Sequence, residues 1–341
     1  RKVLNVPNLR FPEFQGEWKK CTLNEVCKFH NGRAYKQTEL LAAGKYRVLR
    51  VGNFFTNDSW YYSNLELEDN KYAQNGDLLY AWSASFGPRF WREEKVIFHY
   101  HIWKIDSFKN VDKNFLYHFL DLDSAKIKNE VQGGTMVHIT KGDMEKRTIS
   151  YPSVPEQRNI ARFLFLLDER IATQNKIIED LKKLKVAIIE KMFCSPYQEQ
   201  PMCRIKGFKQ PLTTYKLGSF CSRIVTKNKD AKCSLVLTIA AQYGLVNQES
   251  FFNKSVASEN LTGYYLLQKG EFAYNRSYSM GYDWGAVKRL DNYDKGVLST
   301  LYICFKINET IVDSDYLAYY FESSKWHRGL SNIAGEGVRN H

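Results

Sequence analysis

Two small groups of residues have types and spacings that could do chemistry. His99 and His101 alternate within VIFHYHIWKI, an expected strand, so both imidazoles would share one face and could bind a metal. No third ligand is spaced near them, and imidazoles packed in or beside a sheet are the favoured interpretation. Asp77, Glu93 and Lys95 loosely resemble the acid…Glu-x-Lys layout of metal-dependent nucleases. A second copy of the Asp77 turn lacks a matching Glu-x-Lys, which argues against that interpretation.

Cofactor-binding and catalytic motifs are absent from the sequence. It contains no Gly-x-Gly-x-x-Gly and no phosphate-binding P-loop. It also lacks Asn-Pro-Pro-Tyr and Asp-Pro-Pro-Tyr, the stretches used to methylate an amino nitrogen of a base. We therefore predict no catalytic residue, no metal site and no cofactor in this chain.

Basic and polar residues interleaved with aromatic ones indicate a different role. They occur in NGRAYK, SASFGPRFWR, IVTKNK and NRSYSMGYDW, beside turn residues. Such side chains can contact base edges and phosphates, although most of the aromatic residues are expected in the core. Arg33, Lys36, Arg89, Lys227 and Arg276 are the leading candidates because they lie outside apolar runs. The full set of candidate DNA-binding residues is Asn31, Arg33, Lys36, Arg50, Asn53, Ser83, Ser85, Arg89, Gly134, Thr135, His138, Lys141, Lys227, Gln242, Tyr243, Asn275, Arg276, Tyr278 and Arg339.

The composition also favours nucleic acid as the partner. With 341 residues, a net charge of +12 and 44% hydrophobic residues, the chain suits about two folded domains with a positive surface. No apolar run approaches the roughly 20 residues that span a bilayer, and the first residues lack a signal-peptide core. The seven cysteines are odd in number and scattered, which suits reduced thiols. We therefore expect a cytoplasmic protein, with further residues before Arg1.

The chain repeats itself at a nearly constant offset. NGDLLYAW returns as KGEFAYNR, so that Gly76 and Gly270 are 270 − 76 = 194 residues apart. Outward from these glycines, CTLNEVCKF matches YKLGSFCSR, VIFHYHIWKI matches VLSTLYICFKI, and GGTMVHI matches GEGVRNH. Small changes in the offset fit insertions in surface loops. The sequence therefore predicts two copies of one domain-sized unit.

A long amphipathic helix is predicted between the copies. Pro152 and Pro155 mark its start, Pro196 follows it, and neither proline nor glycine occurs from Glu156 to Phe193. Apolar residues recur at spacings of three and four, which predicts a coiled-coil seam. The seam residues are Ile160, Leu164, Leu167, Ile171, Ile178, Leu181 and Ile188. The alternative is a linker helix that packs only on its own domains.

Each copy has the pattern of an α/β domain. Short runs of β-branched and aromatic residues predict strands, which a helix and a glycine turn follow. In the first copy these elements lie at 46–51, 77–82, 96–105, 113–129 and 133–134. The predicted fold class is α/β (α+β), with similar tandem domains at 1–152 and 196–341 joined by a helix at 153–195.

Three stretches carry a family resemblance. They are the helix start YPSVPEQRNIARFLFLLDERI, the preceding GGTMVHITKGDMEKRTI, and VPNLRFPEFQGEWKKCTLNEV near the beginning. With the repeat and the long helix, they resemble the specificity subunit of type I DNA restriction-modification systems. The resemblance covers the whole chain; the Pro-x-x-x-Glu-Gln helix start is fairly specific, whereas the domain interiors are not.

The resemblance implies a non-catalytic chain. Each domain would be a target recognition domain for one half of a split, asymmetric DNA sequence, with the helices as a spacer between the halves. The helices would also dock two methylating subunits, to which two motor-nuclease subunits add. S-adenosylmethionine, ATP and magnesium would belong to those partners. We predict that Arg158, Arg162, Arg170 and Lys176 contact the methylating subunits.

The sequence departs from the family pattern at its end. In the family a second long helix follows the second recognition domain and pairs antiparallel with the first. This sequence stops at His341, level with Ile139 of the first copy. We expect that helix just beyond His341; otherwise a second copy or a partner subunit should cover the seam.

Two other functions are open from the residues alone. The first is a stand-alone nuclease or DNA methyltransferase with two fused DNA-binding domains, for which the sequence lacks the catalytic motifs. The second is a scaffold whose basic charge is incidental. Such a scaffold would bind no DNA, or would bind it without dependence on salt.

Overall fold

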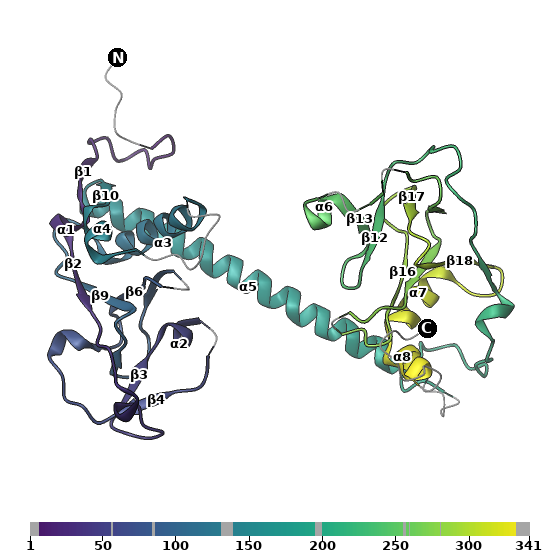
Figure 1. The fold of residues 1–341 in the computed structure, drawn as a ribbon, viewed down its shortest axis with the longest axis horizontal. Helices are drawn as coiled ribbons and strands as arrows, with labels where there is room; N and C mark the ends of the chain where they lie inside the picture. Colours follow the sequence, from purple (N-terminus) through teal and green to yellow (C-terminus); the bar gives the residue numbers. More distant parts are fainter. Residues whose placement is uncertain are drawn as a thin grey trace, which may run out of the picture. The chain divides into compact units, whose positions relative to one another are not determined.

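The computed structural model describes residues 7–55, 57–83, 86–130, 139–194, 200–254, 257–258, 260–279 and 281–331. The chain divides into two units, Arg1–Gln174 and Asn175–His341. Each unit combines strands with short helices, and one long helix, α5 (Val154–Met192), contributes to both (Figure 1).

Unit 1 is built on two four-stranded sheets. The first is antiparallel throughout and has the order β2 (Lys28–Asn31), β9 (Ile102–Asp106), β6 (Leu78–Ala81), β7 (Gly87–Phe90). The second has the order β4 (Tyr61–Ser63), β3 (Tyr46–Leu49), β8 (Val96–Phe98), β5 (Tyr72–Ala73). Within it β3 and β8 run parallel. A separate ribbon pairs β1 (Lys19–Thr22) with β10 (Thr148–Tyr151). The α-helices before α5 are α1 (Leu23–Val26), α2 (Val51–Phe55), α3 (Lys113–Glu130) and α4 (Lys141–Lys146).

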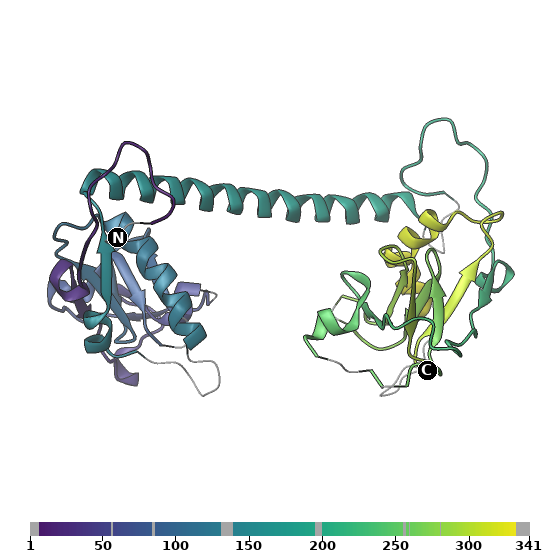
Figure 2. The same cartoon turned by 90° about the horizontal axis from the view of Figure 1, so that it is seen from above.

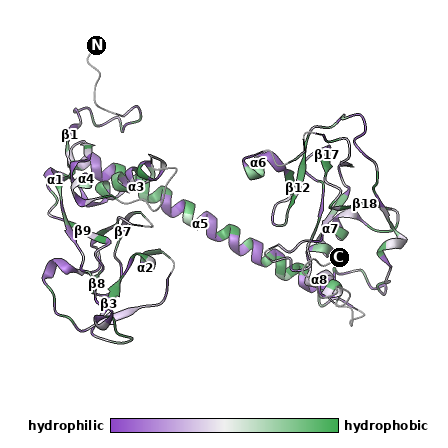
Figure 3. Cartoon of the chain, viewed as in Figure 1, coloured by the Kyte–Doolittle hydropathy of each residue, from purple (hydrophilic) through white to green (hydrophobic). Residues whose placement is uncertain are grey.

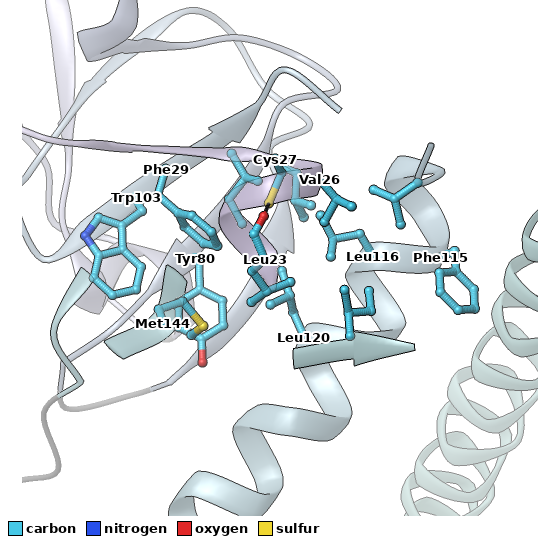
Figure 4. Close-up of a cluster of buried hydrophobic side chains, with 14 of the residues drawn as sticks. Leu23, Val26, Cys27, Phe29, Tyr80, Trp103, Phe115, Leu116, Leu120 and Met144 are labelled. Atoms are coloured by element: carbon cyan, nitrogen blue, oxygen red, sulfur yellow. Dashed lines mark hydrogen bonds between the residues drawn. The ribbon is translucent and has the colours of Figure 1, made fainter. Parts of the chain in front are cut away.

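The main core of unit 1 joins the first sheet to α1 and α3. Figure 4 shows Leu23 from α1 beside Leu116 and Leu120 from α3, in one cluster with Tyr80 and Trp103 from the sheet. All five side chains are at most 1% exposed. The rings of Tyr80 and Trp103 stack with centroids 5.8 Å apart. Full burial of a large apolar side chain contributes about 1.5–3 kcal/mol, so this cluster holds the sheet and helices together.

Helix α5 begins at a buried polar junction in unit 1. Gln157 is fully buried, and its Oε1 accepts a hydrogen bond from the backbone N–H of Asp112 at 2.7 Å. Its Nε2 donates to the backbone carbonyls of Asn110 and Pro152, both at 2.9 Å. One amide thereby satisfies a donor and two acceptors of the neighbouring loops, as buried backbone groups require.

An ion pair beside that junction holds the N-terminal segment. Both carboxylate oxygens of Glu156 accept hydrogen bonds from Arg10, each at 2.7 Å. Glu156 is 1% exposed and lies in the first turn of α5, where a negative charge is favoured by the helix dipole. The Glu-Gln pair therefore ties two segments to the start of the helix.

Unit 2 repeats the strand order of the first sheet of unit 1. Its antiparallel sheet has the order β11 (Cys221–Arg223), β18 (Ile303–Ile307), β15 (Phe272–Asn275), β16 (Ala286–Arg289). Its remaining described strands form two antiparallel pairs, β12 (Leu237–Ala240) with β13 (Gly244–Asn247) and β14 (Tyr265–Gln268) with β17 (Lys295–Leu298). The helices are α6 (Gln248–Phe252), α7 (Ser314–Glu322) and α8 (Ser324–Ser331). Phe29 faces Ile105 in unit 1, and Arg223 faces Phe305 at the corresponding place in unit 2. The α/β prediction with two similar units and a long helix is confirmed.

One predicted strand is wrong. VIFHYHIWKI forms two strands, because β8 ends at Phe98 and a turn leads into β9. In this turn the backbone N–H of Ile102 donates to the carbonyl of His99 at 2.9 Å. β8 pairs in the second sheet and β9 in the first, so the chain crosses between sheets at this point. His99 and His101 therefore lie in a turn and do not alternate on a strand face. The glycine turn at 133–134 lies outside the described residues.

Helix α5 is one unbroken helix (Figure 2), packed near its two ends and open between them. Ala161 and Ile189 are 2% and 8% exposed, and Ile160 packs on the core of unit 1. Leu164 is half-buried. The remaining seam residues are 42–59% exposed, namely Leu167, Ile171, Ile178, Leu181 and Ile188. Apolar and polar residues alternate along this open part (Figure 3). The ends of the helix therefore pack on the domains, as expected for a linker helix. The middle of the seam is not packed against the described chain.

We expect Gln157→Ala to destabilise unit 1. The change removes the fully buried amide that three backbone groups bond, of which the carbonyl of Pro152 is in a buried contact. An unpaired buried polar group costs about 1–3 kcal/mol, so a loss within that range is expected. Urea unfolding followed by tryptophan fluorescence measures it. Asn159→Ala, at an exposed position two residues along the same helix, is the control. Equal unfolding midpoints for the two variants would contradict this role of the amide.

Candidate nucleic-acid interface

Several strands of unit 1 end at one edge. The parallel strands β3 and β8 end side by side at Leu49 and Phe98. The turn after β8 also bridges to the loop after β2, through Arg33 and His99. Strand β6 ends at Ala81, opposite the first residue of β9. We call residues 31–36, 50–53, 82–83 and 99–101 the loop edge of unit 1. Six of the eight described candidates of this unit lie here: Asn31, Arg33, Lys36, Arg50, Asn53 and Ser83.

The arginines on and near this edge lie over aromatic rings. The guanidinium carbon of Arg50 is 4.2 Å from the centroid of Tyr61, and that of Arg89, on β7, is 4.6 Å from Phe55. Neither has a carboxylate partner among the described residues. Stacking on a ring face restrains a guanidinium while its edges stay able to donate hydrogen bonds. Arg50 and Arg89 are thus held in place, and neither guanidinium is neutralised by a carboxylate of the described residues.

The remaining candidates of unit 1 have different surroundings. Lys36 is exposed at the start of a short 3-10 turn, whereas Ser83 is only 3% exposed and its side chain is not on the surface. Asn53 donates to the carbonyls of its own loop and so shapes that loop. Lys141 lies on α4, beside α1 and away from the loop edge, with Glu145 at 3.5 Å. The candidates outside the described residues are Ser85, Gly134, Thr135, His138 and Arg339.

The turn histidines form an aromatic cluster. The rings of His99 and His101 are 4.9 Å apart, and His99 stacks on Tyr35 at 6.4 Å. Burial lowers the pKa of His99 to about 4, and the neighbouring His101 and Arg50 act in the same direction. His99 is therefore neutral at physiological pH. Among the described residues, no group of three or more histidine, cysteine or acidic side chains could hold a metal ion.

The nuclease-like trio is engaged in separate contacts. Asp77 pairs with Lys104 at 2.8 Å, and Glu93 pairs with Arg47 at 2.9 Å. The ammonium of Lys95 lies 3.9 Å from the ring centroid of Tyr72. Each of the three side chains thus has a structural partner of its own.

Unit 2 has a loop edge at the corresponding place. Lys227 lies over the ring of Tyr265 at 3.7 Å. Gln242 and Tyr243 occupy the turn between β12 and β13, where Tyr243 is 69% exposed. The segment after β15 supplies the exposed Arg276 and Tyr278, and Asn275 accepts a hydrogen bond from the N–H of Ser277 at 3.0 Å. We call residues 225–227, 241–243, 275–279 and 299–302 the loop edge of unit 2.

Sequence reasoning missed a partly buried network in unit 2. The hydroxyl of Tyr282 donates to Glu322 at 2.7 Å and accepts from Lys288 at 3.1 Å, while Lys288 also pairs with Glu322. Lys288 is only 9% exposed. The network ties the loop that carries Arg276 and Tyr278 to helix α7. The only signal in the sequence was Lys288 directly after the apolar residues Ala286 and Val287 of β16.

An exposed aromatic pair was also missed. Phe251 and Phe252 of α6 are 46% and 45% exposed, and Phe251 lies 6.4 Å from Tyr243. The turn of Tyr243 therefore has further aromatic surface beside it. Two adjacent phenylalanines after a polar stretch could have indicated this surface.

The candidate partner-binding residues lie along α5. Arg158 has its Nε 3.6 Å from Asp112, although its side chain is 70% exposed. Arg162, Arg170 and Lys176 are exposed and have no ion-pair partner in the described part of the chain. These cations are therefore available to another molecule.

Comparison with known proteins adds a family assignment. The family model described as the type I restriction modification DNA specificity domain matches residues 15–183. Residues 15–183 form a domain of the type I specificity family. The matched residues contain every described strand of unit 1 and 183 − 154 + 1 = 30 of the 39 residues of α5. None of the described helices is both long enough and apolar enough to cross a bilayer.

Individual proteins of this family are similar to parts of the chain. The specificity subunit of the type I restriction enzyme MjaVIII from Methanocaldococcus jannaschii is 30% identical over 122 residues, 36% of this chain and 29% of that protein. The EcoBI specificity subunit from Escherichia coli is 23% identical and matches 50% of this chain and 38% of its own. The chain therefore spans well under half the length of these relatives. A type I S subunit structure from M. genitalium is 16% identical with a TM-score of 0.49, covering 96% of this chain and 83% of that one.

We expect stability to fall in mild acid partly through His99. Because its folded pKa of about 4 lies below the ordinary 6.5, the unfolded chain binds a proton between these pH values that the folded chain does not. Folding is therefore weakened as pH falls from 6.5 towards 4. His118 and His327 have pKa values lowered by burial too, so the test compares His99→Gln with the unaltered chain. Urea unfolding at pH 7, 6 and 5 should give the variant a shallower decline, and an unchanged decline would contradict the assignment.

Proposed function

We propose that the chain is the DNA-recognition subunit of a type I restriction-modification complex. Each loop edge would bind one half of a two-part, asymmetric target in double-stranded DNA. The observation that supports this most is the recurrence of the loop edge at the same place in both units, with different polar side chains on it. A shared frame with unlike loops is what two unlike half-sites require.

The chemistry of the two edges suits DNA. Arginine can donate to base edges in the major groove, and the amides of asparagine and glutamine can both donate and accept there, whereas lysine neutralises phosphate without regard to sequence. The net charge of +12 favours approach to a polyanion. Arg50 and Arg89, restrained on aromatic rings, would lose little side-chain freedom on binding. The exposed Tyr243 and Tyr278 would add contact area.

Helix α5 would serve the protein partners. We propose that two methyltransferase subunits bind Arg158, Arg162, Arg170 and Lys176, and that two restriction and motor subunits join that complex. The exposed seam would be covered by another helix, since each large side chain contributes about 1.5–3 kcal/mol on full burial. S-adenosylmethionine, ATP and magnesium would bind the partners and not this chain. Methylation or cleavage of DNA by the purified chain alone would overturn this proposal in favour of a stand-alone enzyme.

Substitutions in the two units should affect different half-sites. Once the methylated adenines of a host genome have been mapped, duplexes with one altered half-site can be made. We expect Arg89→Ala to weaken binding through the half-site of unit 1 about tenfold to hundredfold, which is the loss expected for an arginine that contacts a base. Arg276→Ala should weaken binding through the half-site of unit 2 by a similar factor. Binding titrations at several salt concentrations measure both losses. Equal losses at both half-sites for either variant would contradict the division of labour.

Shortening α5 should separate partner binding from folding. Removing residues 167–187 deletes 187 − 167 + 1 = 21 residues, about three heptads, and so preserves the phase of the seam and the packed ends of the helix. We expect this chain to keep its thermal unfolding profile and to lose co-purification with a methylating subunit. Normal co-purification of the shortened chain would rule out the docking role of the helix.

A further inference from the structure

Arg33 on the loop edge of unit 1 is fixed at both backbone and side chain. Its backbone N–H donates to the carbonyl of Phe98 at 3.0 Å, and its own carbonyl accepts from the N–H of Tyr100 at 3.1 Å. Its guanidinium carbon lies 5.3 Å from the ring centroid of Tyr35. The two terminal nitrogens Nη1 and Nη2 donate to the two carboxylate oxygens of Glu39, at 3.1 Å and 2.8 Å. The guanidinium plane is therefore restrained from two directions.

The carboxylate that holds Arg33 is itself held. Glu39 ends the short turn Gln37–Glu39, and its Oε2 also accepts from the backbone N–H of Lys36 at 2.8 Å. The hydrogen bond from Arg33 is the main reason why the pKa of Glu39 is lowered, so Glu39 stays ionised. The side chains of Arg33 and Glu39 are 33% and 19% exposed. This is a bidentate pair in fixed geometry, unlike a mobile surface ion pair.

One edge of the guanidinium is left free. A guanidinium has five N–H groups, and Glu39 uses two of them, which leaves 5 − 2 = 3. The N–H on Nε and the remaining one on Nη2 point in the same direction along the side edge of the fork. No described residue accepts a hydrogen bond from Nε of Arg33. Arg33 can therefore offer two parallel donors to another molecule.

Charge decides what that molecule is. The paired Arg33 and Glu39 carry no net charge, so a phosphate gains little attraction from the arginine and is repelled by the carboxylate beside it. A guanine edge is neutral and presents O6 and N7 in the major groove, with the spacing that an arginine fork matches. The geometry favours a base over the DNA backbone.

The matching position in unit 2 has other chemistry. At the repeat offset, 33 + 194 = 227, lies Lys227, which stacks on Tyr265 at 3.7 Å. It has no carboxylate partner in the described part of unit 2. An ammonium is a point charge with its full positive value here, which suits a phosphate.

We propose that Arg33, positioned by Glu39 and Tyr35, recognises a guanine in the half-site of unit 1, whereas Lys227 at the equivalent place in unit 2 contacts phosphate. The proposal rests on the proposed DNA-recognition function. Arg33 is thereby a specificity-determining residue, and Glu39 is a positioning residue that acts through it.

Selection from a pool of duplexes randomised at both half-sites tests the proposal with the full chain. The unaltered chain should enrich a guanine at one position that Arg33→Lys no longer enriches, with a change of about tenfold to hundredfold in preference at that position alone. Glu39→Gln should weaken the same preference and raise affinity for all duplexes, because a negative charge has been removed. Lys227→Gln should lower affinity for every sequence without changing base preference. Because one phosphate contact is lost, the slope of log affinity against log salt concentration should become shallower by about one.

A matched control lies at the opposite end of β3. Lys45 also stacks on a tyrosine, Tyr46, and pairs with Glu66, but it is outside the loop edge. Lys45→Gln should leave every preference unchanged, and thermal unfolding of all variants shows that they are folded. If the unaltered chain enriches no sequence, the proposed function itself fails. If it enriches one and Arg33→Lys keeps every preference, only the role of Arg33 is overturned; unchanged preference in Glu39→Gln overturns the positioning role.

Discussion

The buried amide of Gln157 is the contact on which the placement of the long helix in unit 1 depends. Most of α5 between Leu167 and Ile188 packs on nothing within the described chain, so its direction is set where it leaves the unit. The amide achieves this by bonding to loops on both sides of the first turn. At the other end, Glu190 accepts from the N–H and hydroxyl of Ser324 and lies near Lys325. Polar side chains of the helix therefore anchor it in each unit.

The repeated sheets provide the same frame for unlike loops. Corresponding strands pair in the same order in the two units, and the parallel pairing of β3 with β8 has its counterpart in the bridge between Val236 and Val297. Loops that follow such strands must emerge at one edge, whatever residues they contain. What differs is how each cation is held. Arg33 is neutralised by a carboxylate and Lys227 is not, so equivalent positions can perform different tasks.

The repeat, the α/β class and the extent of α5 were predictable because each rests on a pattern sustained over many residues. The turn at His99 was not, because β8 is entirely buried and the flanking runs show no polar face that would separate two strands from one. The candidate cations were predicted from the turn residues and aromatic residues beside them in the sequence. The side chains that hold these cations could not be predicted in this way. Glu39, Tyr61 and Phe55 meet the arginines only through turns and tertiary packing. The network of Tyr282, Lys288 and Glu322 joins residues from three separate elements, and no local signal connects them.

The separation of frame and loops has a consequence for how such a protein evolves. The large side chains that hold unit 1 together lie in the strands and in helices α1 and α3, whereas Arg33, Lys36 and Arg50 lie beyond the strand ends. Lys36 is exposed, and changes at such surface positions usually alter the free energy of unfolding by no more than about 0.5 kcal/mol. Mutation can therefore alter the preference of one unit while the fold persists and the other unit keeps its ancestral preference. A duplicated chain of this construction can diversify one half of its target at a time.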